Sequence, residues 1–411
     1  MGLLVITGAA FLMSSEKKRI NWKMVAICMG LQLLFALLVL GTSAGKSAFL
    51  ALNGLVATIM HYSDQGAAFL FGDLVSNIPK FGYIFAFHVL PTIIFISALM
   101  QILYYYGIVQ KAIEILAKIV MKVMGTSGAE TLCACANIFM GHTESPLMIR
   151  PYIPTLTQSE LFAVMTGGFA TISAGVFASY AGMLNDAGFE AAAGHLLAAC
   201  LMSAPASLMI AKIMFPETEK AETSGDSKLD TERTDVNAID AAANGASTGL
   251  KLAINVGGML IAFIALIALL NGILGLLGSG VNAVFHTNVV LNFETVFGTL
   301  FWPVSWILGI PVHECTAAGN ILAQQLAMNE FVAYSTLSQS ISALSPRTVT
   351  ILTYAICGFA NISSIAIQIA GIGAIAPNRK QDLAKLGVKA LVAGALTSYL
   401  TAAIAGIITG A

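Results

Sequence analysis

Hydrophobic residues are gathered into long runs along the chain, separated by short polar stretches. A run of about twenty apolar residues is long enough to cross the hydrocarbon core of a bilayer as a helix. Eight runs approach this length and predict eight transmembrane helices, at roughly 2–14 (the shortest), 24–40, 84–104, 161–180, 195–215, 252–277, 349–374 and 388–408. The pattern predicts an all-α polytopic membrane protein.

Three other stretches are too polar or too short to span. Residues 109–124 carry a charge every three or four positions with apolar residues between them, which predicts an amphipathic helix along the cytoplasmic interface. Residues 47–61 predict a similar element on the outer side. Residues 216–246 carry eight acidic and three basic residues and almost nothing to bury, so we expect a solvated linker between two halves.

Two interruptions place a carboxylate beside a histidine at membrane depth. The first is Gly141-His142-Thr143-Glu144-Ser145-Pro146 and the second is Pro311-Val312-His313-Glu314-Cys315-Thr316. An ionisable group in such a place is costly and usually faces a cavity or a partner. The limbs around them, 127–139 with 145–157 and 299–311 with 317–329, are too short to cross, so both predict re-entrant hairpins.

The two halves of the chain also share a motif. Gly168-Phe169-Ala170-Thr171-Ile172-Ser173 is matched by Gly358-Phe359-Ala360-Asn361-Ile362-Ser363, and the spacing from Glu144 to Glu160 equals that from Glu314 to Glu330. The predicted spans put an odd number of crossings between the two motifs, so the repeats have opposite orientations. Inverted repeats with helices broken at the midplane are typical of secondary transporters.

These polar residues are expected to converge on one site at the membrane midplane. The set consists of Thr143, Glu144, His313, Glu314, Thr316 and residues 361–364. Carboxylates, amides and hydroxyls suit a neutral, hydroxyl-rich solute, and Phe359 and Val176 provide an apolar wall. Neither interruption contains Lys or Arg, so a phosphate is not the expected ligand.

Composition excludes several classes of protein. Hydrophobic residues make up 57% of the chain, charged residues make up 10% and mean hydropathy is +0.83, which a water-soluble domain could hardly reconcile with its surface. A net charge of −1, with no basic cluster interleaved with aromatics, gives no indication of nucleic-acid binding. The six cysteines lie mostly in apolar segments, so we expect neither a disulfide framework nor a zinc site.

Basic residues predict the orientation. If the N-terminus is outside, seventeen of the twenty Lys and Arg residues fall on the cytoplasmic side. The first apolar run has no basic region before it and is followed by Glu16-Lys17-Lys18-Arg19, which favours an uncleaved first span over a signal peptide. We expect a multi-pass protein of the cell inner (plasma) membrane.

The interruptions resemble a known family, the concentrative nucleoside transporters. The run from Asn137 to Pro146, followed by Arg150-Pro151-Tyr152, is similar to that family's first hairpin, and the run from Cys357 to Ser364 is similar to its second half. The resemblance extends from about residue 20 onward and implies a homotrimer whose mobile transport domain moves against a scaffold. The parts it implies are scaffold helices 1–108, first repeat 109–215, cytoplasmic linker 216–250, scaffold helix and outer loop 251–295, and second repeat 296–411.

The resemblance also implies residue roles for sodium-coupled nucleoside uptake, with no cofactor beyond the coupling ion. Residues around the base would be His142, Thr143 and Glu144, with room left by Gly141 and with Val176 and Phe359 against its faces. Residues around the ribose would be Glu314, Asn361 and Ser364. Sodium ligands would be the Asn137 side chain, the Met140 carbonyl, the Thr171 hydroxyl and the Ile172 carbonyl.

Two residues depart from the family pattern and keep alternatives open. His142 stands where glutamine is usual, so purines as well as pyrimidines, a modified nucleoside or a free base remain candidate solutes, and His313 stands where asparagine is expected. Proton coupling is the alternative to sodium coupling. An intramembrane metal enzyme is disfavoured because residues 313–317 lack the second histidine of His-Glu-x-x-His.

Overall fold

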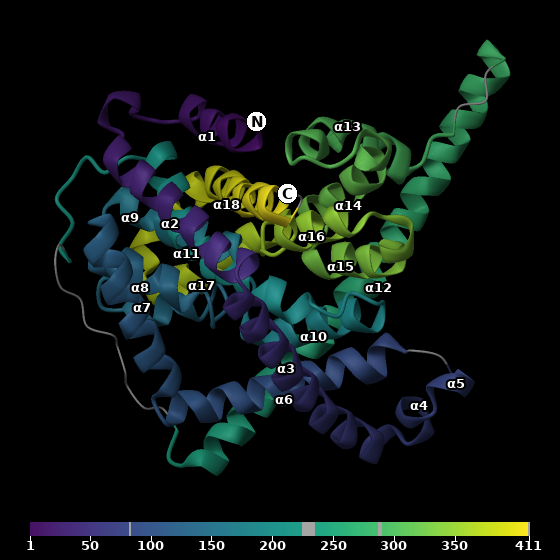
Figure 1. Cartoon of the computed structure of the whole chain (residues 1–411), viewed down its shortest axis with the longest axis horizontal. Coiled ribbons are helices and arrows are strands. Elements are labelled where there is room, and N and C mark those ends of the chain that lie inside the picture. Colours follow the sequence, from purple (N-terminus) through teal and green to yellow (C-terminus); the bar gives the residue numbers. More distant parts are fainter. Residues whose placement is uncertain (82–83, 224–234, 287–289, 410–411) are drawn as a thin grey trace.

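The computed structural model describes residues 1–81, 84–223, 235–286 and 290–409, and the described residues contain helices and no strand (Figure 1). The N-terminal half contains α1 (Gly2–Leu12), α2 (Trp22–Gly41), α3 (Ser43–Phe71), α4 (Asp73–Ser76), α5 (Ile78–Phe81), α6 (Phe85–Tyr105), α7 (Ile108–Met124), α8 (Gly128–Ala136), α9 (Gln158–Ala170), α10 (Ala174–Asp186) and α11 (Ala192–Met214). The C-terminal half contains α12 (Ala238–Phe285), α13 (Phe293–Ile307), α14 (Cys315–Ala327), α15 (Glu330–Ser340), α16 (Pro346–Ala355), α17 (Ile362–Ile375) and α18 (Lys380–Thr409). Short 3₁₀ turns occur at Lys17–Arg19, Ser145–Ile149, Ile153–Thr155, Val312–Glu314, Ile341–Ala343 and Pro377–Arg379.

Six helical stretches are long and apolar enough to cross a membrane, and each includes or overlaps a predicted span. They are Trp22–Gly41, Ala86–Tyr105, Gln158–Asp186, Ala192–Met214, Ala238–Gly280 and Pro377–Thr409. The helices at the two other predicted spans, α1 and α17, are apolar but shorter, with 11 and 14 residues. The prediction of an all-helical protein with many apolar helices is confirmed.

Two of the predicted spans are interrupted by extended backbone. The first unwound stretch, residues 171–173, separates α9 from α10, and Thr171 adopts φ −135° and ψ 164°. The second unwound stretch, residues 356–361, separates α16 from α17, and Asn361 begins α17 as its N-cap residue. Each repeated Gly-Phe-Ala motif therefore lies where a helix ends.

Helix α18 lies at the centre of the bundle, where it contacts α9, α11, α16, α17 and α2 (Figure 1). The second unwound stretch and α9 approach each other closely because residue 358 is glycine. A Cβ added to Gly358 would lie 2.6 Å from the carbonyl oxygen of Phe169. The second unwound stretch therefore packs directly against the end of α9. Large buried aromatic side chains fill the remaining space, among them Tyr180, Tyr334 and Phe169.

Helices α6 and α12 pack along each other outside this bundle. Helix α12 has 48 residues, and its apolar side chains remain exposed in the isolated chain, with Ile261 and Leu276 each 76% exposed. Its N-terminal end is joined to α6 by Asp235, whose carboxylate accepts hydrogen bonds from Gln101 at 2.8 Å and from Asn244 at 2.8 Å. The pair, named here the α6–α12 layer, meets the bundle where α6 packs against α10.

The predicted limbs of the first hairpin are only partly helical. The outgoing limb is α8, but the return limb contains two 3₁₀ turns, at Ser145–Ile149 and Ile153–Thr155, instead of an α-helix. The reason is local, because Pro146, Pro151 and Pro154 lack backbone N–H donors and restrict the residues before them.

The second interruption differs from the prediction more strongly. Helices α13 and α14 flank residues 308–314, but a further break follows at Met328-Asn329 and a new helix, α15, begins at Glu330. The Asn329 side chain caps α15 by accepting a hydrogen bond from the Val332 amide at 3.0 Å. From Glu160 to Gly168 the first half has 8 residues, whereas from Glu330 to Gly358 the second half has 28. The twenty extra residues supply most of α15 and the first turns of α16.

Two smaller predictions were wrong in extent. The outer element predicted at 47–61 belongs to α3, which has 29 residues. Helix α12 begins at Ala238, inside the predicted linker, because the Asn237 side chain accepts hydrogen bonds from the Ile239 and Asp240 amides and caps the helix. Residues 224–234 of the linker lie outside the described residues.

The amphipathic helix predicted at 109–124 is confirmed as α7, with Val109, Ile113 and Ala117 buried.

Candidate functional site

The loop between α8 and the first 3₁₀ turn, residues 137–144, lies against the first unwound stretch. The Ala174 amide donates to the Phe139 carbonyl at 3.1 Å, and the Thr171 hydroxyl donates to the Asn137 carbonyl at 3.0 Å. The second unwound stretch joins the same place, because the Phe359 amide donates to the Thr171 carbonyl at 3.3 Å. Three irregular segments that are far apart in the sequence therefore meet.

The four predicted sodium ligands are close to one another and buried. Asn137 is 1% exposed and its side-chain oxygen accepts from Ser145 Oγ at 2.7 Å, while Thr171 is 2% exposed. In the part of the chain that the structure describes, the backbone carbonyls of Met140 and Ile172 accept no hydrogen bond. Unwound backbone in an apolar environment leaves such carbonyls available to a cation.

His142 lies at the tip of the loop, with both ring nitrogens buried and without a hydrogen-bond partner among the described residues. Its ring lies nearly perpendicular to that of Phe359 in a T-shaped contact, with the ring centroids 4.8 Å apart. Gly168 makes room for it, since an added Cβ would lie 2.8 Å from the Cβ of His142. Thr143 lies beside Gly371 of α17.

Glu144 accepts a hydrogen bond from the Gly141 amide at 3.2 Å and faces a cavity of about 430 Å³. The cavity is lined by residues of the loop, of α6 and of the α12 side, including Ser173, Ser97, Gln101, Tyr104, Thr248 and Leu252. It extends to Arg150, Gln110 and Asp235, which also line it. The carboxylate therefore stands between the bundle and the α6–α12 layer.

A second buried carboxylate, Glu330, lies beside the other unwound stretch. Asn361 Nδ2 donates to Glu330 Oε2 at 3.1 Å, and Tyr180 Oη donates to Glu330 Oε1 at 3.1 Å. Asn361 Oδ1 in turn accepts from the Ser364 amide at 2.9 Å and from Ser363 Oγ at 2.7 Å. Glu330 is 4% exposed, so its position is fixed by these partners.

Glu314 is not brought to this cluster. Its carboxylate accepts hydrogen bonds from the Ser345 amide at 3.0 Å and the Ser345 hydroxyl at 2.9 Å, at the start of α16. His313 Nε2 lies 3.5 Å from Glu314 Oε1, and its side chain is 80% exposed. The expectation that Glu314 and His313 meet Asn361 is therefore not supported by these contacts, and Glu330 occupies the expected place.

The equal spacing of the two glutamate pairs misled the sequence prediction. Glu144 precedes Gly168 by 24 residues. Glu330 precedes Gly358 by a similar number, 28, whereas Glu314 precedes it by 44. Counting back from the repeated Gly-Phe-Ala motif would have pointed to Glu330. Val176, the remaining predicted residue, is 1% exposed near the start of α10. Among the described residues, no group of three or more His, Cys, Asp or Glu side chains is arranged to hold a metal ion.

Models of known protein families match three successive parts of the chain. Residues 195–406 match the model described as "Na+ dependent nucleoside transporter C-terminus", and residues 1–74 match the corresponding N-terminus. Residues 86–187 match a model described as "Nucleoside recognition". These three matches cover both unwound stretches and the loop at residues 137–144.

Similar proteins agree with these matches. The nucleoside permease NupC of Helicobacter pylori is 38% identical over 100% of this chain and 97% of its own length. Human solute carrier family 28 member 3 is 38% identical over 99% of this chain and 59% of its own. The structure of CNTnw in an inward-facing substrate-bound state has a TM-score of 0.91 and 40% identity, covering 100% of this chain and 96% of that chain.

These matches confirm the resemblance read from residues 137–146 and 357–364 and concern transporters, which are not enzymes. They agree with a membrane protein built from several apolar helices. The chain belongs to the family of Na+-dependent nucleoside transporters.

Proposed function

We propose that this protein takes up nucleosides across the cell inner membrane by sodium-coupled symport with alternating access. The observation that carries the proposal is the meeting of two unwound stretches and the loop at residues 137–144. Glu144 stands on that loop, and the Glu330–Asn361 pair lies at the end of the second unwound stretch. Such broken helices at membrane depth are the places where secondary transporters hold solute and ion.

The ribose is assigned to the Glu330 cluster. A carboxylate accepts from sugar hydroxyls, and a hydrogen bond to a charged acceptor is stronger than one between neutral groups. Asn361 donates to Glu330, and the Ser364 amide donates to Asn361 in turn, so these two residues add an amide and a hydroxyl. Glu314, which the sequence had suggested for this role, is assigned instead to holding the start of α16 through Ser345.

The base is assigned to His142, Thr143 and Glu144 of the loop, beside Gly141. Phe359 supplies an aromatic ring whose centroid lies 4.8 Å from that of the His142 ring, and Val176 is a buried apolar neighbour of the first unwound stretch. A planar heterocycle has apolar faces and polar edges, and this combination of side chains suits both.

Sodium is assigned to four oxygens at the same junction, those of the Asn137 side chain, the Met140 carbonyl, the Thr171 hydroxyl and the Ile172 carbonyl. Two of them are backbone carbonyls without a hydrogen bond in the described part of the chain, which supports this set. Hard cations prefer oxygen ligands of this kind. The site is joined to the solute site through the Phe359–Thr171 backbone contact, which gives a physical route for coupling.

Release is assigned to the cavity that leads from Glu144 to Arg150 and Gln110. Its walls come from the loop on one side and from α6 and α12 on the other, so movement of the bundle against the α6–α12 layer would open and close it. We place the N-terminus outside and the cavity mouth in the cytoplasm, following the basic residues. A homotrimer would cover part of the exposed apolar surface of α12.

A second candidate changes only the solute. Both ring nitrogens of His142 lack partners in the described part of the chain, so they are free to pair with a base edge different from the one that a glutamine amide would select. This observation favours a base preference that differs from that of a protein with glutamine at position 142. The candidate solutes then include modified nucleosides and free bases.

The test is uptake of labelled uridine and adenosine into liposomes that contain the purified protein. An inward sodium gradient should drive both, and replacing sodium with choline should abolish the accumulation. Uptake that followed an imposed proton gradient instead would reject the sodium assignment. Sealed vesicles that took up neither compound would reject the nucleoside assignment.

A further inference from the structure

Tyr180 connects the two halves of the chain at the proposed ribose site. It lies on α10, and its hydroxyl donates to Glu330 Oε1 at 3.1 Å. Its ring stacks on Tyr334, with ring centroids 4.4 Å apart, and meets Phe331 in a T-shaped contact at 4.7 Å. Both aromatic partners belong to α15, as does Glu330. Tyr180 therefore holds the carboxylate through its hydroxyl and the helix that carries the carboxylate through its ring.

The helix that carries Tyr180 begins at the proposed sodium site. Thr171 and Ile172 supply two of the proposed sodium ligands, and α10 begins directly after them, at Ala174. From Ala174 the helix runs unbroken to Tyr180, about 9 Å further along at 1.5 Å per residue. A continuous helix is stiff over so short a length because each turn is hydrogen-bonded to the next. A displacement of the first unwound stretch is therefore carried along α10 to Tyr180.

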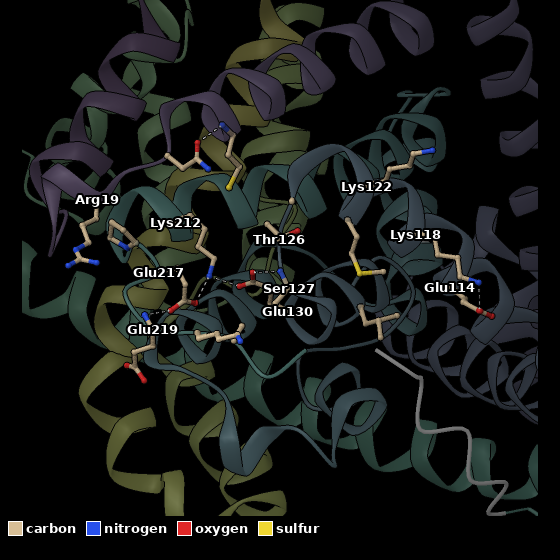
Figure 2. Close-up of a pocket in the computed structure, with 18 residues that line it drawn as sticks. Arg19, Glu114, Lys118, Lys122, Thr126, Ser127, Glu130, Lys212, Glu217 and Glu219 are labelled. Atoms are coloured by element: carbon tan, nitrogen blue, oxygen red, sulfur yellow. Dashed lines mark hydrogen bonds and ion pairs between the residues drawn. The ribbon is translucent and has the colours of Figure 1, made fainter. Parts of the chain in front are cut away.

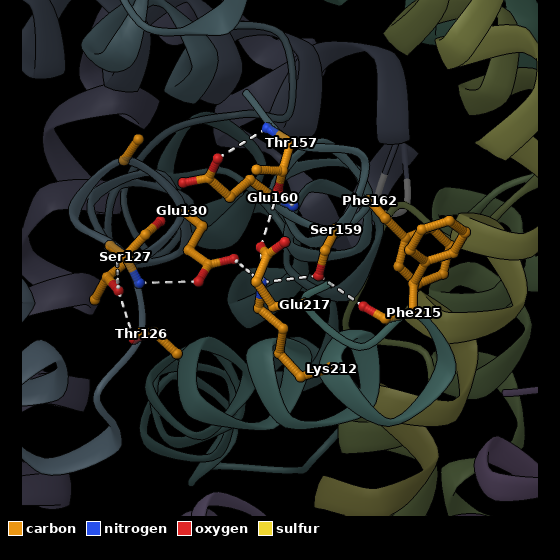
Figure 3. A network of polar contacts seen from close by, with 12 residues as sticks. Thr126, Ser127, Glu130, Thr157, Ser159, Glu160, Phe162, Lys212, Phe215 and Glu217 are labelled. Atoms are coloured by element: carbon orange, nitrogen blue, oxygen red, sulfur yellow. Dashed lines mark hydrogen bonds and ion pairs between the residues drawn. The ribbon is translucent and has the colours of Figure 1, made fainter. Parts of the chain in front are cut away.

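The helix on the other side of the first unwound stretch, α9, is anchored at its start. Lys212 Nζ lies 2.8 Å from Glu130 Oε2 and 3.2 Å from Glu217 Oε2 on the wall of one cavity (Figure 2). The same lysine donates to Ser159 Oγ of α9 at 2.9 Å (Figure 3). Thr223, which follows α11, accepts hydrogen bonds from two amides at the start of α8. These contacts hold α8, α9 and α11 together, so a displacement of the unwound stretch is taken up by α10 and not by α9.

We propose that Tyr180 is a positioning residue that couples the sodium site to the ribose site. When the oxygens of Thr171 and Ile172 close on the ion, the start of α10 moves with them. Tyr180 then moves the Glu330 carboxylate into the place where it accepts from the sugar hydroxyls. Sodium thus changes where the hydrogen-bonded pair stands, and the hydrogen bond itself is kept. The inference rests on the proposed function, since it needs both the ion and the nucleoside.

A different contact leads from the sodium site to the base. The Phe359 amide donates to the Thr171 carbonyl at 3.3 Å, so the ion also acts on the aromatic side chain beside the proposed base site. The Tyr180 hydroxyl leads to the sugar instead. Removing this hydroxyl should therefore weaken the effect of sodium on a complete nucleoside and leave its effect on a nucleoside without sugar hydroxyls unchanged.

The experiment measures the binding of uridine and of 2′,3′-dideoxyuridine to the purified full chain by isothermal titration calorimetry, in sodium chloride and in choline chloride. The sodium enhancement is the ratio of the Kd in choline to the Kd in sodium. Tyr180→Phe keeps the ring and its stacking but loses the hydroxyl. Its sodium enhancement for uridine should fall roughly tenfold, the effect of one hydrogen bond to a charged group. The enhancement for dideoxyuridine should equal that of the unmodified protein.

The matched control is Tyr334→Phe. Tyr334 is as fully buried as Tyr180 and belongs to the same aromatic stack, but its hydroxyl donates to the Thr353 carbonyl at 2.9 Å. This variant also loses a buried hydrogen bond, yet it should keep the sodium enhancement for uridine. A double variant tests the route, because Tyr180 acts through Glu330. Adding Tyr180→Phe to Glu330→Gln should weaken uridine binding no further.

The inference would be overturned by an unchanged enhancement for uridine in Tyr180→Phe, by an equal fall for dideoxyuridine, by an equal fall in Tyr334→Phe, or by additive losses in the double variant. In each of these cases the unmodified protein still binds uridine more tightly in sodium, so the proposed function stands. An unmodified protein that binds uridine equally well in sodium and in choline would instead reject the proposed sodium coupling, and the inference with it.

Discussion

Replacing Glu330 by glutamine separates the ribose assignment made from the structure from the one made from the sequence. The Glu330 carboxylate accepts from Tyr180 Oη and from Asn361 Nδ2, both at 3.1 Å. A glutamine keeps the shape but has one oxygen and one NH₂ group, so one of these donors would face another donor. A sugar hydroxyl that donates to the carboxylate would also lose a charged acceptor.

The size of the effect follows from that geometry. A hydrogen bond to a charged group contributes roughly 1.5–3 kcal/mol, and losing one of them weakens binding roughly 10- to 150-fold. Glu330 is 4% exposed, so water cannot easily take the place of the lost acceptor. Glu314→Gln provides the matched control, because Glu314 is also buried but accepts from Ser345 instead of Asn361.

The assay compares binding of uridine with that of 2′-deoxyuridine and 3′-deoxyuridine by isothermal titration calorimetry of the purified protein. In the unmodified protein and in Glu314→Gln, at least one deoxy analogue should bind more weakly than uridine. In Glu330→Gln that difference should shrink towards zero, because the partner of the missing hydroxyl is already impaired. Unchanged discrimination in Glu330→Gln, together with lost discrimination in Glu314→Gln, would refute the reasoning and restore the assignment made from the sequence.

Three further predictions concern the ion, the base and the stability of the bundle. Thr171→Val removes one proposed sodium ligand. It should raise the sodium concentration for half-maximal uridine uptake about tenfold, since one hydrogen-bonding oxygen is worth roughly 1–2 kcal/mol. An unchanged sodium titration would remove Thr171 from the ligand set. His142→Gln should raise the uptake of uridine relative to that of adenosine about fivefold, because a glutamine amide both donates and accepts and so pairs with the imide edge of uracil. An unaltered uptake ratio would mean that this side chain does not contact the base. Lys212→Met should lower stability by roughly 3–5 kcal/mol by leaving Glu130 buried and unpaired, as measured by thermal unfolding, and adding Glu130→Gln should recover part of the loss. Equal instability of the single and double variants would argue against that pairing.

The helices and their apolar character could be predicted because burial in a bilayer depends mainly on local composition. The runs at 24–40 and 195–215 fall almost entirely within α2 and α11. The amphipathic α7 could be predicted for the same reason, since its charges recur at helical spacing. Interruptions were also visible, because proline, glycine and charged residues rarely occur together inside a spanning helix.

The pairing of carboxylates could not be predicted from spacing alone. Glu314 and Glu330 are both preceded by polar residues, and only the fold decides which of them meets Asn361. That decision depends on the break at Met328-Asn329, where a two-residue connection ends α14 and starts α15. The sequence signal for this break is weak, consisting of an asparagine cap followed by a glutamate. Tyr180, which holds the other oxygen of Glu330, comes from the opposite half of the chain and was missed.

The ends of the segment between α11 and α12 are fastened to different parts of the molecule. Thr223 accepts hydrogen bonds from the Gly128 and Ala129 amides at the start of α8, whereas Asp235 is held by Gln101 of α6. These contacts do not require a peptide connection between residues 223 and 235. A gene divided at this position would therefore encode two polypeptides that keep both attachments, and their co-expression should reconstitute the transporter.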